Sequence, residues 1–129
     1  NGLNRFDRDT GNFTHYTKKE GLAENVIYNI LEDEMGNLWL SSNKGLSRFT
    51  PATGQIKNYS PRDGLQYYEF NLGAFFKNKS GEMFFGGLNG FNSFFPAKIS
   101  GNLHVPPIQI TRIIFEKSTG TAGSGDTHT

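Results

Sequence analysis

The order of apolar and polar positions in this chain predicts short β-strands separated by glycine turns. Residues 25–33 place apolar side chains on both faces of an extended strand: Val26, Tyr28 and Ile30 on one face, Ile27 and Leu31 on the other. Such a strand is typical of an interior position, where neighbouring sheets cover both of its faces. Further strands are predicted at 38–42, 46–49 and 55–59. The last of these is polar and alternating, which fits an outer edge.

This pattern of strands and turns repeats along the chain. The segment Gly2–Phe6 returns 43 positions later as Gly45–Phe49, and the match continues in register to Gly64-Leu65. A second match has a spacing of 45 and pairs residues 33–39 with 78–84. A period of about 40–45 residues, filled with short strands and Gly turns, is the signature of a propeller blade. The sequence therefore predicts an all-β chain built from four-stranded antiparallel β-propeller blades, as a fragment of a larger propeller.

The repeats predict how the chain is divided. Residues 1–105 are expected to form a partial propeller, with the end of one blade at 2–17, one full blade at 25–60 and most of a last blade at 70–95. Pro106-Pro107 then interrupt the pattern, because proline cannot donate to a central ladder. We expect residues 106–129 to begin a second domain, with one strand at 108–115 followed by a polar loop.

Composition excludes several classes of function. The net charge is only +1, which gives no electrostatic case for binding nucleic acid or an anionic membrane surface. The chain has no cysteine, so disulfides and thiolate metal sites are excluded. No apolar run approaches the roughly 20 residues of a membrane helix. Because the chain starts on Asn and enters in the middle of a repeat, we expect it to be an excerpt of a longer protein.

Several segments resemble the two-component regulator propeller repeat. They are Asn25-Val26, Glu32-Asp33, Gly36-Asn37-Leu38-Trp39 and Lys44-Gly45-Leu46-Ser47-Arg48-Phe49. Residues 86–96 resemble the final blade of the periplasmic sensor region in hybrid two-component system histidine kinases of Bacteroidetes. Residues 105–111 resemble the entry into the three-tyrosine, immunoglobulin-like linker domain of such sensors, so 106–129 would be the first strand and loop of that domain, which is incomplete here.

The resemblance implies a non-catalytic sensor segment, located in the periplasm as part of an inner-membrane protein. Its parent would detect a glycan-derived ligand and transmit the signal toward the membrane. The implied partners are the remaining blades of the parent chain and an oligosaccharide ligand, with the membrane reached only through the parent chain. No cofactor is implied. Two alternatives remain open: a fragment of a propeller-fold carbohydrate-active enzyme or lyase, and a propeller scaffold that binds protein.

An enzyme would need acid, base or metal residues that converge on one face, and the sequence shows none. Glu32 and Asp33 are adjacent on a strand and so point to opposite faces; Asp33 is expected to accept N–H groups of the turn toward Gly36. His15, His104 and His128 lack metal-ligand spacing, so no metal site is expected. The glycine-rich segment 86–90 precedes a strand, which predicts a hairpin turn and not a phosphate-binding loop.

Bulky aromatic residues at repeated positions are expected to form the structural core. They are Trp39, Phe84, Phe49 and Phe94, with Phe84 as the counterpart of Trp39 in the last blade. Trp39 could also stack on a sugar ring, but the aromatic residue at the equivalent position of the next repeat favours packing between blades.

The best local ligand candidate is Tyr67-Tyr68-Glu69, in the connection between two blades. Loops carry function on a rigid scaffold, and two tyrosines beside a carboxylate could stack on a sugar and bond its hydroxyls. The alternative is that these residues only cover the blade junction. Finally, a fragment with incomplete blades exposes strand edges and apolar faces, so we expect it to self-associate.

Overall fold

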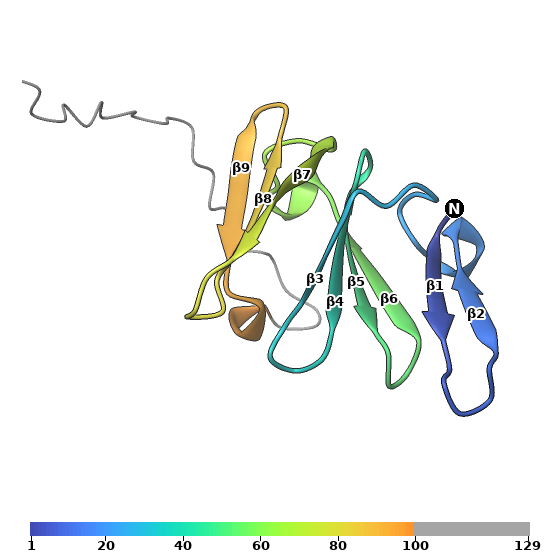
Figure 1. The fold of residues 1–129 in the computed structure, drawn as a ribbon. Coiled ribbons are helices and arrows are strands. Elements are labelled where there is room, and N and C mark those ends of the chain that lie inside the picture. The colour runs from blue at the N-terminus through green and yellow to red at the C-terminus, as the bar shows by residue number, and fades with distance from the viewer. Residues whose placement is uncertain (100–129) are drawn as a thin grey trace, which may run out of the picture.

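The computed structural model describes residues 1–99 of the chain. Three antiparallel sheets stand side by side in chain order, as Figure 1 shows, so each sheet packs mainly against its sequence neighbours. The predictions at Pro106-Pro107, 108–115 and the linker domain lie outside the described residues. The all-β prediction is confirmed, since the described residues contain strands and three short 3-10 turns, η1 (Lys18–Glu20), η2 (Pro61–Asp63) and η3 (Pro96–Lys98).

The strands agree closely with the predicted pattern. The first sheet holds β1 (Leu3–Phe6) and β2 (Phe13–Tyr16); the second holds β3 (Asn29–Glu32), β4 (Leu38–Ser42), β5 (Gly45–Thr50) and β6 (Gln55–Tyr59); the third holds β7 (Phe70–Lys77), β8 (Met83–Gly87) and β9 (Gly90–Phe94). Four antiparallel strands therefore lie within 25–60, as predicted. The first of them is shorter than expected, because residues 25–28 belong to the connection, where the Tyr28 N–H still donates to the Ser41 carbonyl at 2.8 Å.

The sheets converge along one edge. The main strand-to-strand contacts between the second and third sheets are made by β7, chiefly with β3 and to a lesser extent with β4. The strands β3 and β7 are the first of their sheets, so these edges lie together while the later strands diverge (Figure 1). This radial arrangement is that of propeller blades around an axis, with β3 and β7 nearest to it.

Glycines recur at the start of β1 and β5 because the backbone there leaves no room for a side chain. Gly45 opens β5 with φ +102°, and a Cβ there would collide with the carbonyl oxygen of Tyr59. Gly2 stands at the equivalent place, with φ +82°, against the carbonyl of Tyr16. The repeated glycine is therefore required both by its backbone angle and by the close approach of the neighbouring strand.

Each connection between sheets begins with a 3-10 turn closed by a capping box. Thr17 and Glu20 bond each other's backbone N–H groups around η1, and Ser60 and Asp63 do the same around η2. The Glu20 carboxylate accepts hydrogen bonds from the hydroxyl and the backbone N–H of Thr17, and these bonds hold its pKa below the usual value. Different residues thus preserve the same reciprocal capping in both repeats.

Two apolar cores fill the spaces between the sheets. Leu3 and Leu22 of the first repeat pack on Leu40 and Phe49 of the second sheet. On the other side of that sheet lies the larger core: Trp39, Leu46, Tyr59, Leu65, Phe70, Met83, Phe85, Phe94 and Ile99. The Trp39 ring lies 5.4 Å from Tyr59 and 4.8 Å from Phe94, between centroids. Trp39, Phe49 and Phe94 are therefore buried, as predicted.

Phe84 differs from that prediction because it is only half-buried, while its strand neighbours Met83 and Phe85 are buried. The strand register explains this difference. Trp39 pairs with Arg48, and Phe84 pairs with Ser93 at the same position one repeat later. Both rings face the side of the following sheet, and within the described residues only Trp39 has such a sheet against it. Phe84 is therefore the counterpart of Trp39, as predicted, but its burial depends on whether another sheet packs against it.

Candidate functional site

Tyr67, Tyr68 and Glu69 line a hollow of about 290 Å³ together with Asn43 and Lys44. The two tyrosine side chains are 43% and 45% exposed, so both rings present surface to solvent. Their centroids lie 5.8 Å apart in an edge-to-face arrangement. The site combines two apolar ring surfaces with hydroxyl, amide, ammonium and carboxylate groups. This is the combination that a polyhydroxylated ring can use, through stacking and hydrogen bonds.

The backbone beneath these side chains is firmly held. The Gly45 N–H donates to the Tyr68 carbonyl at 2.6 Å, and the Leu88 N–H donates to the Glu69 carbonyl at 3.3 Å. The connection is therefore tied to the β4–β5 hairpin of its own blade and to the β8–β9 hairpin of the next. Loops fixed in this way can present side chains with little cost in entropy.

Gln66 and Asn92 add side-chain bonds at the same junction. The Gln66 N–H donates to Asn92 Oδ1 at 2.9 Å, and Gln66 Oε1 accepts from the Asn89 N–H at 2.9 Å. Asn92 Nδ2 also donates to the Gly64 carbonyl at 3.3 Å. The candidate residues thus stand on a rigid platform that joins two blades.

The preceding connection has the same backbone but other side chains. There the Gly2 N–H donates to the Asn25 carbonyl at 2.5 Å, which reproduces the bond between Gly45 and Tyr68 one repeat later. Glu24 and Asn25 stand where Tyr67 and Tyr68 stand in the next repeat. Because the same backbone bond forms without the tyrosines, the backbone of this junction does not require two aromatic rings. The two tyrosines are therefore an addition to the junction and not part of its repeated backbone frame.

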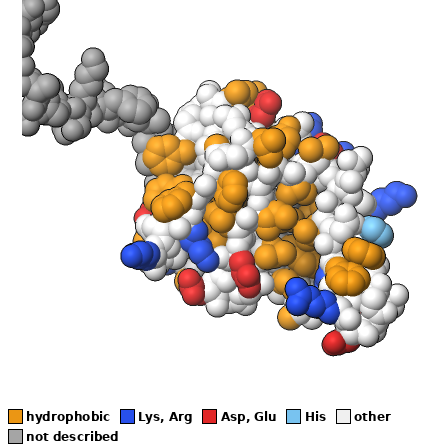
Figure 2. All heavy atoms as spheres, viewed as in Figure 1, with side chains coloured by type: hydrophobic (Ala, Val, Ile, Leu, Met, Phe, Trp, Pro, Cys, Tyr) orange, Lys and Arg blue, Asp and Glu red, His pale blue; other side chains and the backbone are white. Residues whose placement is uncertain are grey.

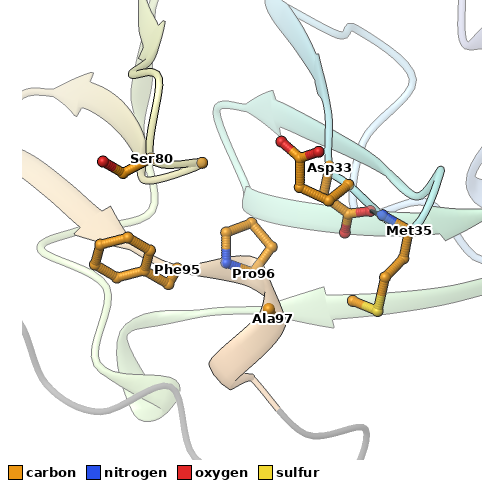
Figure 3. A pocket seen from close by; sticks show the side chains of 8 residues that line it. Asp33, Met35, Ser80, Phe95, Pro96 and Ala97 are labelled. Carbon is orange, nitrogen blue, oxygen red and sulfur yellow. Dashed lines mark hydrogen bonds between the residues drawn. The ribbon is translucent and has the colours of Figure 1, made fainter.

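A second hollow lies near the opposite, β3–β4 end of the sheets and is too small for a sugar. Its volume is about 50 Å³, and its lining includes Asp33, Ser80 and Pro96. Figure 3 shows Pro96 at the centre, with Ser80 and Phe95 on one side and Asp33 and Met35 on the other. A water molecule occupies about 30 Å³ of liquid volume, so this space suits water.

Asp33 is committed to its own turn, as predicted. Its Oδ1 accepts from the N–H groups of Met35 and Asn37, both at 2.9 Å. Its Oδ2 accepts from Asn37 Nδ2 at 3.1 Å and from the indole N–H of Trp39 at 3.0 Å. Asp33 is buried and Glu32 is exposed, so the two carboxylates do not form a pair for acid–base chemistry.

A third hollow of about 230 Å³ runs beside β1, lined by Leu3, Asn4, Arg5, Leu38, Phe49 and Pro51. Figure 2 shows hydrophobic side chains gathered in the middle of the molecule. Among the described residues β1 pairs only with β2, whereas its counterpart β5 has partners on both sides. The hollow lies between the first and second sheets, beside the strand edge of β1 that has no partner among residues 1–99.

The remaining candidates do not converge. Among residues 1–99 no group of three His, Asp or Glu side chains could hold a metal ion. His15 bonds to Asn4 across the β1–β2 pair, and His104 and His128 lie outside the described residues. The glycine-rich segment 86–90 forms the β8–β9 hairpin, as expected. Sequence reasoning did not identify Asn43 and Lys44 as candidate site residues. Their position in a hairpin beside a blade connection could have indicated them.

Comparison with known proteins identifies the repeat. Residues 21–44 match the family model for the two-component regulator propeller. The chain carries the two-component regulator propeller repeat. It is 37% identical over 91 residues to histidine kinase P4 of Formosa agariphila, covering 70% of this chain and 7% of that protein. This chain thus spans a small part of the length of its relative.

Two solved structures share the propeller fold. One is the extracellular domain of BT3049 from B. thetaiotaomicron, named as a hybrid two-component system, with a TM-score of 0.61 and 19% identity; the match covers 75% of this chain and 14% of that one. The other is the extracellular domain of BT4673 from the same organism, with a TM-score of 0.57, 22% identity, and coverage of 67% and 12%. Within residues 1–99 no helix has the length and apolar character to cross a membrane.

Proposed function

We propose that this chain is a non-catalytic sensor segment of a hybrid two-component system and that it contributes to binding a glycan-derived ligand in the periplasm. The observation that supports this most directly is the hollow formed by Tyr67, Tyr68, Glu69, Asn43 and Lys44. Two exposed rings stand over a rigid platform, at a junction whose counterpart in the previous repeat lacks them. The matches to a histidine kinase and to extracellular propeller domains support the same context.

The hollow suits recognition better than chemistry. Acid–base catalysis of glycoside cleavage needs two carboxyl groups about 5–10 Å apart, and Glu69 is the single carboxylate in the lining. A sugar ring placed on either tyrosine would find hydroxyl, amide and charged groups around its rim. We assign Tyr67 and Tyr68 to stacking and Glu69 to accepting hydrogen bonds from sugar hydroxyls.

The test uses the complete sensor region of the parent protein and a panel of di- to hexasaccharides from neutral and acidic polysaccharides. The best binder of the panel is then titrated by calorimetry against Tyr67→Ala and Tyr68→Ala. We expect each variant to weaken binding about tenfold, in the range for lost aromatic stacking. Glu24→Ala is the matched control, because Glu24 is the counterpart of Tyr67 in the preceding connection, and it should bind normally. Unchanged affinity in both tyrosine variants would contradict the proposed site.

We further propose that the junction after the last blade transmits the signal to the linker domain. A ligand shifts a sensor only through unequal affinity for two states, and the change of pattern at Pro106-Pro107 is where two bodies would meet. In the intact receptor, replacing both prolines with glycine should weaken signalling while the affinity of the isolated sensor region stays near normal. Signalling that survives this change would contradict the transmitting role.

A further inference from the structure

The repeat changes its period at one place, and the structure locates it. The spacing is 43 from Asn25 to Tyr68, which make the same backbone bond in successive repeats. It is 45 from the Ile30–Leu40 pair to the Phe75–Phe85 pair. Between Phe70 and Phe75 the pairing of β7 with β8 shifts register. Two additional residues are therefore accommodated in a bulge of β7, the strand nearest to the propeller axis.

A buried side chain from the neighbouring blade holds this bulge in place. Asn29 of β3 donates from Nδ2 to the Asn71 carbonyl and to Ser41 Oγ, both at 2.8 Å, and its Oδ1 accepts from the Gly73 N–H at 2.7 Å. Asn29 thereby satisfies two backbone groups that the shifted ladder leaves without a strand partner. A buried amide is costly unless it is hydrogen-bonded. Two of the three bonds that Asn29 makes are to the backbone of the bulge, so its burial depends on the bulge.

The counterpart of this polar clamp is absent from the next repeat. At a spacing of 45, Ala74 and Gly86 stand where Asn29 and Ser41 stand. Gly73 adopts φ +80°, a backbone angle that residues other than glycine rarely adopt. The bulge thus uses both a dedicated partner and a dedicated glycine. Bulges of this kind commonly redirect a side chain beside a functional site.

The side chain that the bulge presents is Leu72, which is 75% exposed. It lies three positions after Glu69, on the strand that leaves the candidate hollow. Phe70 pairs with Gly87 at the hairpin end of the sheet, so the bulge begins one residue below the platform of Tyr67–Glu69. An exposed leucine on the bulge therefore stands on the strand that leaves the proposed ligand site. Three residues of extended strand span about 10 Å, a distance that an oligosaccharide can bridge.

We propose that the Asn29-held bulge selects the ligand, with Leu72 contacting the apolar C–H face of a saccharide that also stacks on Tyr67 or Tyr68. The proposal rests on the proposed function and adds its specificity element. Asn29 acts as a positioning residue, since its side chain reaches the ligand only through the bulge. Sugars with a bulky polar substituent on that face should bind less tightly, because contact with Leu72 would cost the substituent hydrogen bonds to water.

The test measures selectivity with the same oligosaccharide panel and the complete sensor region. Leu72→Ala should weaken binding of the best binder about tenfold, the lower part of the range for a lost apolar contact, and should change the ranking of sugars. Met35→Ala is the matched control, because Met35 is an exposed apolar residue on a turn at the opposite end of the sheet. It should change neither affinity nor ranking.

Two further variants test the bulge. Deleting Leu72 and Gly73 restores the spacing of 43 and should retain folding, seen in the thermal unfolding curve, while selectivity among sugars is lost. Asn29→Ala should alter the ranking of sugars at a temperature where the variant is folded, a readout that a purely structural role would not change.

The outcomes separate the two proposals. If the tyrosine variants weaken binding while Leu72→Ala leaves affinity and ranking unchanged, the bulge proposal is wrong and the proposed function stands. If neither the tyrosine nor the Leu72 variants affect a measurable binding, both assignments to this site are wrong. A wild-type sensor region that binds no saccharide of the panel would overturn the proposed function and the bulge proposal together.

Discussion

Asp33 and Trp39 show how single residues join a turn to the core of the blade. The carboxylate accepts two backbone N–H groups of its turn and the indole N–H of Trp39, so the turn and the buried ring fix each other. In the next repeat Asn78 takes over the turn, since its Oδ1 accepts from the N–H groups of Ser80 and Glu82. Phe84, the counterpart of Trp39, has no side-chain N–H that would need an acceptor.

The hydrogen bond between Asp33 and the Trp39 indole predicts that mutations of the two residues have non-additive effects in a double-mutant cycle. Asp33→Asn keeps an oxygen for the turn but directs an NH2 group at the Trp39 indole N–H, so two donors face each other. We expect a loss of about 1–3 kcal/mol of unfolding free energy, the cost of an unsatisfied buried donor. In a Trp39→Phe background, which copies the next repeat, the same change should cost much less. Urea unfolding of the four chains checks this; additive effects would contradict it.

Tyr59 makes a second prediction at the residue scale. Its hydroxyl is buried without a hydrogen-bond partner among the described residues. Burial raises the pKa of Tyr59; nearby Arg48 opposes the shift and Asp63 adds to it. The unfolded chain therefore releases this proton first as the pH rises past about 10, and the stability contributed by the neutral form is lost above that pH.

Tyr59→Phe should accordingly remove part of the alkaline loss of stability. Near pH 7 the variant should be as stable as the wild type to within about 1 kcal/mol, because no hydrogen bond among the described residues is lost. Above pH 10 its unfolding free energy should fall less steeply. Denaturant unfolding at both pH values measures this difference. Parallel losses in the two proteins would show that Tyr59 does not titrate on unfolding.

At the scale of elements, hairpins and capped turns recur because each solves the same local problem. The capping boxes at Thr17 and Ser60 use different residues for the same bonds, so chemistry is preserved where identity is not. The glycines at hairpin starts are preserved more strictly. There the close approach of the next strand allows no side chain.

Gly36 and Gly45 both have a positive φ, and comparing them distinguishes the cost of the backbone angle from the cost of a steric clash at the Cβ position. Gly45 and Gly36 have φ of +102° and +82°, but a Cβ would meet the Tyr59 carbonyl at Gly45 and nothing within 4 Å at Gly36. Gly36→Ala should cost about 1 kcal/mol, from the left-handed angle alone. Gly45→Ala should cost clearly more, because β5 must also move away from β6. Equal losses in thermal unfolding would contradict the collision argument.

At the scale of the whole molecule, the described sheets leave two uncovered faces. On the third sheet Phe76, Phe84 and Phe91 lie at the positions of Leu31, Trp39 and Leu46, which the next sheet covers in the preceding repeat. Phe76 is 61% exposed. On the first sheet Phe6 and Phe13 are exposed and pack on each other at 4.8 Å. Both faces carry apolar side chains of the kind that a neighbouring sheet covers on the second sheet.

The isolated chain is therefore expected to self-associate through these faces or through open strand edges. Sedimentation velocity over a concentration series should show a rising mean mass. Phe84→Glu should reduce the association, because it places a charge in the centre of the aromatic face. Asn89→Glu is the matched control, since it adds the same charge at an exposed hairpin position. A stable, compact monomer at high concentration would contradict this prediction.

The sequence alone determined the local structure and its repetition. Apolar alternation predicted the strands, glycines predicted the turns, and the register between repeats identified Trp39 and Phe84 as counterparts. Asp33 was correctly assigned to its turn because its partners lie within six residues in the chain. These features depend on short-range geometry, which residue order specifies directly.

Only the tertiary structure decided what each repeat faces. The half-burial of Phe84 follows from the sheet beside it. The grouping of Asn43 and Lys44 with Tyr67–Glu69 depends on how a hairpin meets a connection more than twenty residues away. The change of spacing from 43 to 45 was visible in the sequence, but its place in β7 and its clamp by Asn29 were not. Such contacts are set by the packing of one blade on the next, and no local pattern encodes which surfaces that packing brings together.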